Sequence, residues 1–183
     1  MLYPIPAVMV SCGIPGEKPN IITVAWTGTV CSDPAMVYIS VRPERYSYDI
    51  IKKTGEFVIN LTTERLAKIT DLCGVKSGRD IDKFREYGLT AVKSKHVSAP
   101  SIGESPVNIE CRVKQVISLG SHDMFIAEVR GVTVDADYMD ENGRFDLAKT
   151  RPLVYSHGEY FAQGHFIGKF GFSVKKKGNK RGK

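Results

Sequence analysis

Alternation of apolar and polar residues, with a period of two, is the feature that most limits how this chain can fold. In the clearest run, one set of side chains is apolar and the interleaved set is charged: Ile109, Cys111, Val113 and Ile117 against Glu110, Arg112 and Lys114. Because successive side chains of a strand point to opposite faces, this run predicts a long strand with one buried face. A turn at Leu119-Gly120-Ser121 leads into a second β-rich run, residues 124–134. The two runs are predicted to pair as an antiparallel hairpin.

Strands also dominate the rest of the chain. Shorter β-rich runs cover residues 5–12, 20–26, 35–41, 56–61 and 152–156, and Asn142-Gly143 marks a further tight turn. Helical spacing is found only at residues 46–53, 63–73 and 82–87, the first two with Gly55 and Gly74 as expected stops. Helices do not alternate regularly with strands, which argues against a doubly wound fold. We therefore expect a mainly β fold, a closed or partly closed antiparallel barrel with peripheral helices.

Length and charge indicate one domain and a basic tail. The 183 residues suffice for a single core, and we expect a domain over residues 1–172 followed by a disordered tail, 173–183. Residues 175–183 hold six Lys or Arg and no acid, which leaves 20 basic and 20 acidic residues elsewhere. The tail is interpreted as a solvated extension, because a nucleic-acid binder needs a basic face on its body. No apolar run can span a bilayer and the first residues do not resemble a signal peptide, so a cytoplasmic location is expected.

The cysteines give no sign of a metal site. Cys12, Cys31, Cys73 and Cys111 are widely spaced and form no Cys-x-x-Cys pair, and the histidines have no ligand spacing either. We expect no metal, and free thiols that mostly pack in the core. The common nucleotide-binding and hydrolase signatures, such as Gly-x-Gly-x-x-Gly and Gly-x-Ser-x-Gly, are also absent.

A cluster of small residues follows the only Trp of the chain. Within residues 20–34, the candidate contacts to a flat heterocycle are Thr23, Ala25, Trp26, Thr27, Gly28, Thr29, Cys31, Ser32 and Asp33. Small side chains leave backbone N–H and C=O groups accessible, and these can bind the polar edge of a ring. A strand connection rich in turn formers explains the same residues equally well.

Two further segments suit an anion. Arg42, Arg45 and Ser47 stand immediately before a predicted helix, where free N–H groups and guanidinium groups favour phosphate. A Ser-Gly turn with flanking basic residues follows later in the chain, giving the candidates Ser77, Gly78, Arg79, Asp80 and Lys83. The alternatives are a capped helix with surface arginines and a charged loop.

His122 stands at the predicted hairpin turn, directly before a strand. There it could donate a hydrogen bond to a bound ring or substrate, although a turn histidine more often lies in solvent.

Taken in order, these clusters resemble the flavin reductase-like family, in particular its flavoredoxin-type members. The resemblance runs from about Pro4 to Phe172. It rests on the joint order of Pro-x-Pro-x-x-x-x-Ser-Cys, Asn-Ile-x-Thr-x-Ala-Trp-x-Gly, Ser-Asp-Pro, Ser-Val-Arg-Pro-x-Arg-Tyr-Ser, Gly-Glu-Phe-Val-Ile-Asn, Ser-Gly-Arg-Asp-x-Asp-Lys-Phe, Ile-Glu-Cys and Gly-Ser-His.

The resemblance implies a six-stranded Greek-key split barrel and a homodimer, with FMN at or near the dimer interface. On that pattern Trp26 to Thr29 and Cys31 to Asp33 line the isoalloxazine, and Arg42, Arg45 and Ser47 hold the phosphate. Ser77 to Asp80 and Lys83 close over the cofactor, His122 lies on the substrate side, and residues 155–161 cover the pocket.

The expected function is therefore an FMN-dependent oxidoreductase. NAD(P)H or a reduced donor protein would supply electrons, and free flavin, an iron chelate or a protein would accept them. Two alternatives stay open at this point: an FMN-binding carrier or sensor without turnover, and a nucleic-acid-binding β-barrel. The neutral body argues against the last.

Overall fold

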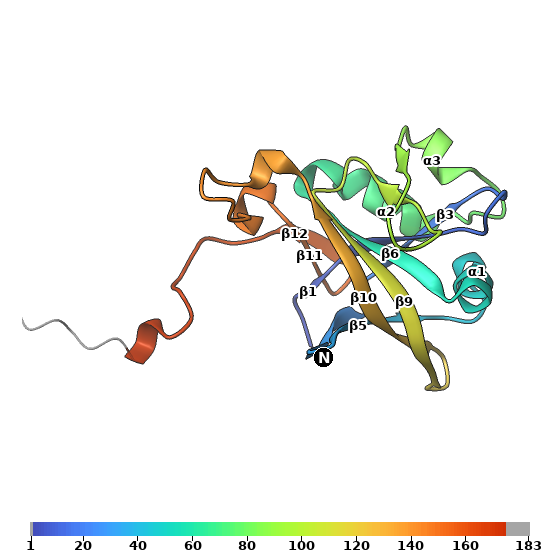
Figure 1. Ribbon diagram of the computed structural model, residues 1–183, viewed down its shortest axis with the longest axis horizontal. Helices are drawn as coiled ribbons and strands as arrows, with labels where there is room; N and C mark the ends of the chain where they lie inside the picture. Colours follow the sequence, from blue (N-terminus) through green and yellow to red (C-terminus); the bar gives the residue numbers. More distant parts are fainter. Residues whose placement is uncertain (1, 175–183) are drawn as a thin grey trace, which may run out of the picture.

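The computed structural model describes residues 2–174, and its main element is a seven-stranded antiparallel sheet (Figure 1). The strand order is β3-β2-β6-β9-β10-β5-β4, and a separate three-stranded sheet has the order β1-β11-β12. The predicted mainly β, antiparallel fold is confirmed. Within the described residues, no helix is long and apolar enough to cross a membrane.

The strands of the main sheet are β2 (Val8–Cys12), β3 (Asn20–Val24), β4 (Thr27–Ser32), β5 (Ala35–Val41), β6 (Glu56–Leu61), β9 (Val107–Ser118) and β10 (Asp123–Val134). The smaller sheets hold β1 (Ile5–Pro6), β11 (Leu153–Ser156) and β12 (Glu159–Ala162), and β7 (Ala91–Val92) with β8 (Ser101–Ile102). The helices are α1 (Tyr46–Thr54), α2 (Ala67–Val75) and α3 (Lys83–Glu86), with short 3-10 turns at η1 (Glu64–Leu66), η2 (Ala136–Tyr138), η3 (Leu147–Thr150) and η4 (Phe172–Val174).

The predicted hairpin is confirmed as β9 and β10, which pair over their whole length. Their register shifts between Ile126 and Ala127, so Phe125 pairs with Val116 and not with Ile117. After this register shift, Ile117 pairs with Met124 and lies on the face opposite to Phe125. The prediction that Ile117 shares the buried face of Cys111 is therefore wrong. A bulge inserts one residue into one strand and so reverses the alternation after it, which a strict period of two cannot anticipate.

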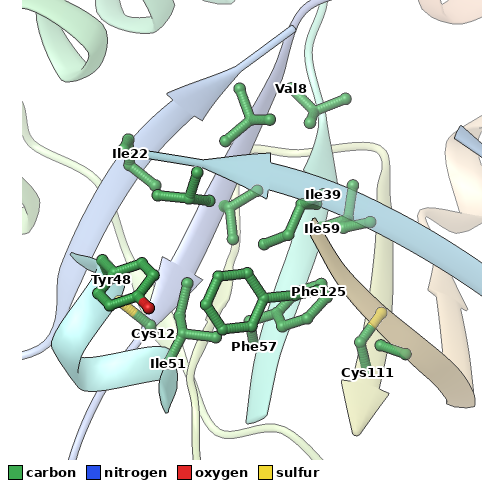
Figure 2. Close-up of a cluster of buried hydrophobic side chains, with 14 of the residues drawn as sticks. Val8, Cys12, Ile22, Ile39, Tyr48, Ile51, Phe57, Ile59, Cys111 and Phe125 are labelled. Atoms are coloured by element: carbon green, nitrogen blue, oxygen red, sulfur yellow. The ribbon is translucent and has the colours of Figure 1, made fainter. Parts of the chain in front are cut away.

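A buried hydrophobic cluster fills the space enclosed by the main sheet and α1 (Figure 2). Phe57 and Phe125 are fully buried, as are Ile39 and Ile51 from β5 and α1. Cys12 and Cys111 also belong to this cluster, and Cys73 is buried in a second one beneath α2. The expectation of free thiols packed mostly in the core is confirmed.

Two local predictions need correction. Residues 27–32, which lay between two predicted strands, form the edge strand β4, paired with β5. Gly74 does not stop a helix, because α2 continues to Val75. A Cβ at Gly74 would lie 3.2 Å from the Cβ of Thr23, so glycine lets α2 approach β3 closely. The predicted tail residues 175–183 lie outside the described part of the chain.

Candidate functional site

Two adjoining cavities lie where α2, the start of α1 and the end of β3 meet. The larger has a volume of about 480 Å³, within the range of about 300–1,000 Å³ that small-molecule sites occupy. The smaller has a volume of about 160 Å³. Ile22, Arg45, Gly74 and Val75 line both, so the cavities share a wall.

The larger cavity is bounded on one side by the residues that follow β3. Thr23, Ala25 and Trp26 line it, as do Arg42 and His122. The rings of Trp26 and His122 pack against each other, with centroids 4.3 Å apart and planes tilted by 43°. The backbone carbonyl of Trp26 accepts a hydrogen bond from the Ser40 N–H at 2.9 Å, which fixes the Trp26 backbone against β5. An aromatic wall and small neighbours suit a flat ring system.

Burial and charge both act on His122. Partial desolvation lowers the pKa of its imidazole, and the positive charges of Arg42 and Arg45 lower it further, against the opposing effect of Glu44. Its Nδ1 lies 2.9 Å from the Ser121 Oγ. The lowered pKa favours the neutral form of the His122 imidazole, which lines the larger cavity.

The smaller cavity gathers the two predicted anion segments. It is lined by Arg45 and Ser47 from one segment, and by Ser77, Gly78, Arg79 and Lys83 from the other. The two segments lie 30 positions apart in the sequence, from Ser47 to Ser77. Cationic side chains, a hydroxyl and the start of α1 together provide the donor set that phosphate requires.

Asn20 fixes the geometry between these segments. Its amide Nδ2 donates to the Ser47 Oγ at 2.7 Å, and both residues are buried. A Cβ at Gly78 would lie 2.0 Å from the Asn20 Oδ1, so only glycine fits there without displacing Asn20. The Lys18 ammonium donates to the Gly78 carbonyl at 3.1 Å and holds the loop from its other side.

Lys83 is a buried cation at the base of the smaller cavity. Its ammonium donates to the carbonyls of Ile21 at 2.6 Å and Cys73 at 2.7 Å. Burial lowers its pKa, because the charged form loses hydration. Two of the three N–H donors are engaged by these carbonyls, and Lys83 also lines the smaller cavity.

The arginines differ in role. Arg79 donates to the Glu44 carbonyl at 3.3 Å and lies over the Tyr46 ring at 5.5 Å, so it links its loop to the start of α1. Arg42 pairs with Glu44 at 3.5 Å and lines only the larger cavity. Of the arginines predicted to bind phosphate, Arg45 alone lines both cavities.

Some predicted residues line neither of these two cavities: Thr27, Gly28, Thr29, Cys31, Ser32, Asp33 and Asp80. The first six belong to β4 and the turn after it, where pairing with β5 carries the chain along the edge of the sheet. Within one copy they do not contact the site, and their contact with a flavin stays a prediction. Asp80 is exposed in the loop before α3.

Tyrosines from both ends of the chain form another side of the larger cavity. It consists of Tyr3, Tyr155 and Tyr160, from or beside β1, β11 and β12, together with Asp71 of α2. Tyr155 packs on Tyr3 and on Tyr160 with centroids 6.2 and 5.4 Å away. Burial, followed by the nearby Asp71 carboxylate, raises the pKa of Tyr160 to about 12. Residues 155–161 were expected at the pocket, but no sequence pattern indicated Tyr3 or Asp71.

Comparison with known proteins agrees with this geometry. The model of the flavin reductase like domain matches residues 1–164. An uncharacterized protein of Archaeoglobus fulgidus is 36% identical over 160 residues, covering 87% of this chain and 88% of that protein. Flavoredoxin of Desulfovibrio vulgaris superimposes with a TM-score of 0.89 at 34% identity, covering 96% of this chain and 95% of its own.

A second flavoredoxin structure, from Methanosarcina acetivorans, has a TM-score of 0.84 at 27% identity, with the same coverage of 96% and 95%. The family match spans most of the chain, and the structural matches span the same fold and the elements that form both cavities. This chain is a member of the flavin reductase-like domain family, with the split-barrel fold of that family.

Proposed function

We propose that this protein binds FMN, with the phosphate in the smaller cavity and the isoalloxazine in the larger. The observation that carries the proposal is the wall that the two cavities share. A cationic recess beside an aromatic cleft matches a ligand that has a phosphate at one end and a flat ring at the other. The similarity to flavoredoxins supports the same assignment.

The residues of the two cavities would each contribute a distinct part of binding. Arg45, Arg79 and Lys83 would neutralise the phosphate, and the Ser47 hydroxyl and the nearby backbone N–H groups would orient it. Trp26 and the tyrosines would pack against the ring and limit its contact with water. The His122 imidazole would offer a hydrogen bond at the edge of the cavity where a substrate enters. When bound, FMN would supply hydride and electron transfer, so the chain needs no acid or base for that chemistry.

The reaction class that follows is oxidoreduction. NAD(P)H or a reduced donor protein would deliver electrons to the site, and free flavin, ferric iron or a protein would receive them. Similarity to a flavoredoxin over nearly the whole chain supports an electron-transfer role.

A homodimer belongs to the same proposal, and the outer face of the sheet supports it. Tyr38 pairs with Ile126, and Ser40 with Met124, on the face of β5 and β10 that points away from the core. Tyr38, Met124 and Ile126 are only half-buried in one copy. A sheet with apolar residues on both faces is normally covered on both. Since Ser40 also lines the larger cavity, a second copy here would lie beside the flavin and could bring β4 to it.

Titration with flavins tests the proposal. Purified protein should bind FMN with a change in the flavin absorbance bands, and riboflavin, which lacks the phosphate, should bind at least tenfold more weakly. A failure to bind either flavin would refute the assignment. Protein that binds FMN but transfers electrons from neither NADH, NADPH nor a reduced ferredoxin-type donor would be a carrier or sensor instead.

A further inference from the structure

The last described segment, residues 163–174, leaves the body of the protein and is called here the C-terminal arm (Figure 1). Large apolar side chains are spaced along it with very high exposed fractions: Phe166 76%, Ile167 82%, Phe170 108%, Phe172 57% and Val174 81%. Isolated exposed apolar residues are normal on a protein surface, but five within nine consecutive residues are typical of an interaction site. Such a composition also differs from that of a solvated linker, which is poor in aromatic residues.

After Gln163, the described backbone hydrogen bonds of the arm do not reach the body of the protein. The Gln163 N–H donates to the Pro152 carbonyl at 3.2 Å, and the backbone bonds after it stay within the arm: Phe172 N–H to Lys169 O at 2.9 Å and Val174 N–H to Gly171 O at 3.3 Å. Phe172 also packs beside Gly168. The arm is therefore locally ordered while its apolar side chains face water.

An exposed apolar surface lies beside the larger cavity, which Trp26 and His122 line. Trp26 and Leu119 are 48% and 58% exposed, and both contact His122: Trp26 through its ring, at 4.3 Å, and Leu119 through its N–H, which donates to the His122 carbonyl at 3.0 Å. These three residues are called here the cavity rim. The exposure of Trp26 and Leu119 leaves this apolar surface beside the larger cavity without a cover.

The start of the arm links the two surfaces. The arm follows β12, whose Tyr160 lines the larger cavity, and from there it runs outward (Figure 1). At about 3.3 Å per residue, an extended segment of this length reaches roughly 40 Å. In a two-fold dimer, a contact made by one copy is repeated by the other. Each arm would start beside its own cavity and reach across to the other copy.

We propose that the C-terminal arm binds a second copy of this chain and covers that copy's cavity rim. The aromatic side chains of the arm then pack against Trp26 and Leu119 of the partner copy. Each site is completed by the other chain, which excludes water from the exposed side of the cavity. The inference builds on the proposed function in taking the larger cavity as the flavin site and in taking the protein as a homodimer. The exchange of arms itself is tested without any flavin.

Photo-crosslinking from the arm tests the exchange directly. A benzophenone amino acid replaces Phe170 in the full-length chain, and irradiation should give a covalent product of twice the chain mass. Peptide mapping should place the crosslink within residues 26–41 or 117–126 of the partner copy. The matched control carries the same amino acid at Val92, an exposed apolar residue of the body, and should give no such product. Crosslinks confined to one chain, or crosslinks between chains that map elsewhere, would overturn the proposal.

Truncation gives a second, independent measurement. A chain ending at Gln163 should form dimers with a dissociation constant at least tenfold higher than a chain ending at Val174, measured by sedimentation velocity. Circular dichroism checks that both are folded. Equal dissociation constants would contradict a stabilising arm. If both truncated chains bind FMN and only the crosslinking fails, the arm proposal falls and the flavin assignment stands.

Discussion

The ring centroids of the Trp26 indole and the His122 imidazole lie 4.3 Å apart, and Arg42 is close enough for its charge to act on the imidazole. Desolvation is the larger cause of the lowered His122 pKa, and Arg42 adds to it. Replacing Arg42 by Gln removes a positive charge that disfavours imidazolium, so the His122 pKa should rise. NMR titration of the imidazole Hε1 signal measures this.

The control for that titration is Arg85→Gln. Arg85 lies on α3 and is not among the charges that act on His122, so this variant should leave the His122 titration unchanged. An Arg42→Gln titration that coincides with the wild-type curve would show that the two groups do not interact.

Arg45 and Arg42 should differ in their effect on FMN binding. Arg45 lines both cavities, whereas Arg42 lines only the larger one and pairs with Glu44. Arg45→Ala should weaken FMN binding by about 1.5–3 kcal/mol, the value of a charge-assisted hydrogen bond, and should hardly change riboflavin binding. Arg42→Ala should have a clearly smaller effect. Fluorescence titration with both flavins measures the difference, and equal losses for the two variants would place the phosphate elsewhere.

Gly78→Ala should reduce FMN affinity although it adds only a methyl group. The new Cβ would lie 2.0 Å from the Asn20 Oδ1, so Asn20 must move and its hydrogen bond to Ser47 must break. A buried hydrogen bond lost with its partners left unpaired costs about 1–3 kcal/mol. Urea denaturation should show a loss of this size, and FMN should bind at least tenfold more weakly. Gly164→Ala, with nothing within 4 Å of its Cβ, is the matched control. Wild-type stability in the Gly78 variant would contradict the packing.

The free energy of unfolding should fall above pH 9. Burial raises the pKa of Cys12 and Cys111 to about 12 and that of Cys73 to about 11, from 9.0. Between pH 9 and these values the unfolded thiols lose protons that the folded ones keep, so stability present below pH 9 is lost as the pH rises. Each thiol contributes up to about 1.4 kcal/mol per pH unit.

One group opposes this trend. The pKa of Lys83 is lowered from 10.5 by burial, so between its folded and unfolded values the folded state binds fewer protons and stability rises with pH. The effect of the three thiols on stability exceeds that of the single lysine, so the free energy of unfolding still falls as the pH rises. Urea unfolding at pH 8 and pH 10 measures it. Cys111→Ala should make the slope less steep by about one thiol's contribution of 1.4 kcal/mol per pH unit, whereas Val113→Ala, a truncation on the same strand without a titrating group, should not.

Local patterns predicted the strands and helices where one rule acted alone. The hairpin of β9 and β10 followed from alternation around a glycine turn, and α1 begins at Tyr46 and ends before Gly55. The predictions were wrong where tertiary contact overrode the local signal. The absence of a side chain at Gly74 lets α2 pack closely against β3. Residues 27–32 form β4 because they pair with β5. Ile117 loses its expected face to a register shift, which depends on both strands.

The sequence by itself determined the antiparallel β class, the thiol-bearing core and the residue types of an anion site, because each depends on short-range periodicity or on a side chain's own chemistry. Only the tertiary structure decided that Arg45, Ser47, Gly78 and Lys83 line one cavity, and that tyrosines from both ends of the chain close its neighbour. The physical reason is that strand pairing brings together residues that are far apart in the chain, and local patterns predict the pairing of neighbouring strands in a hairpin but not of strands distant in the sequence.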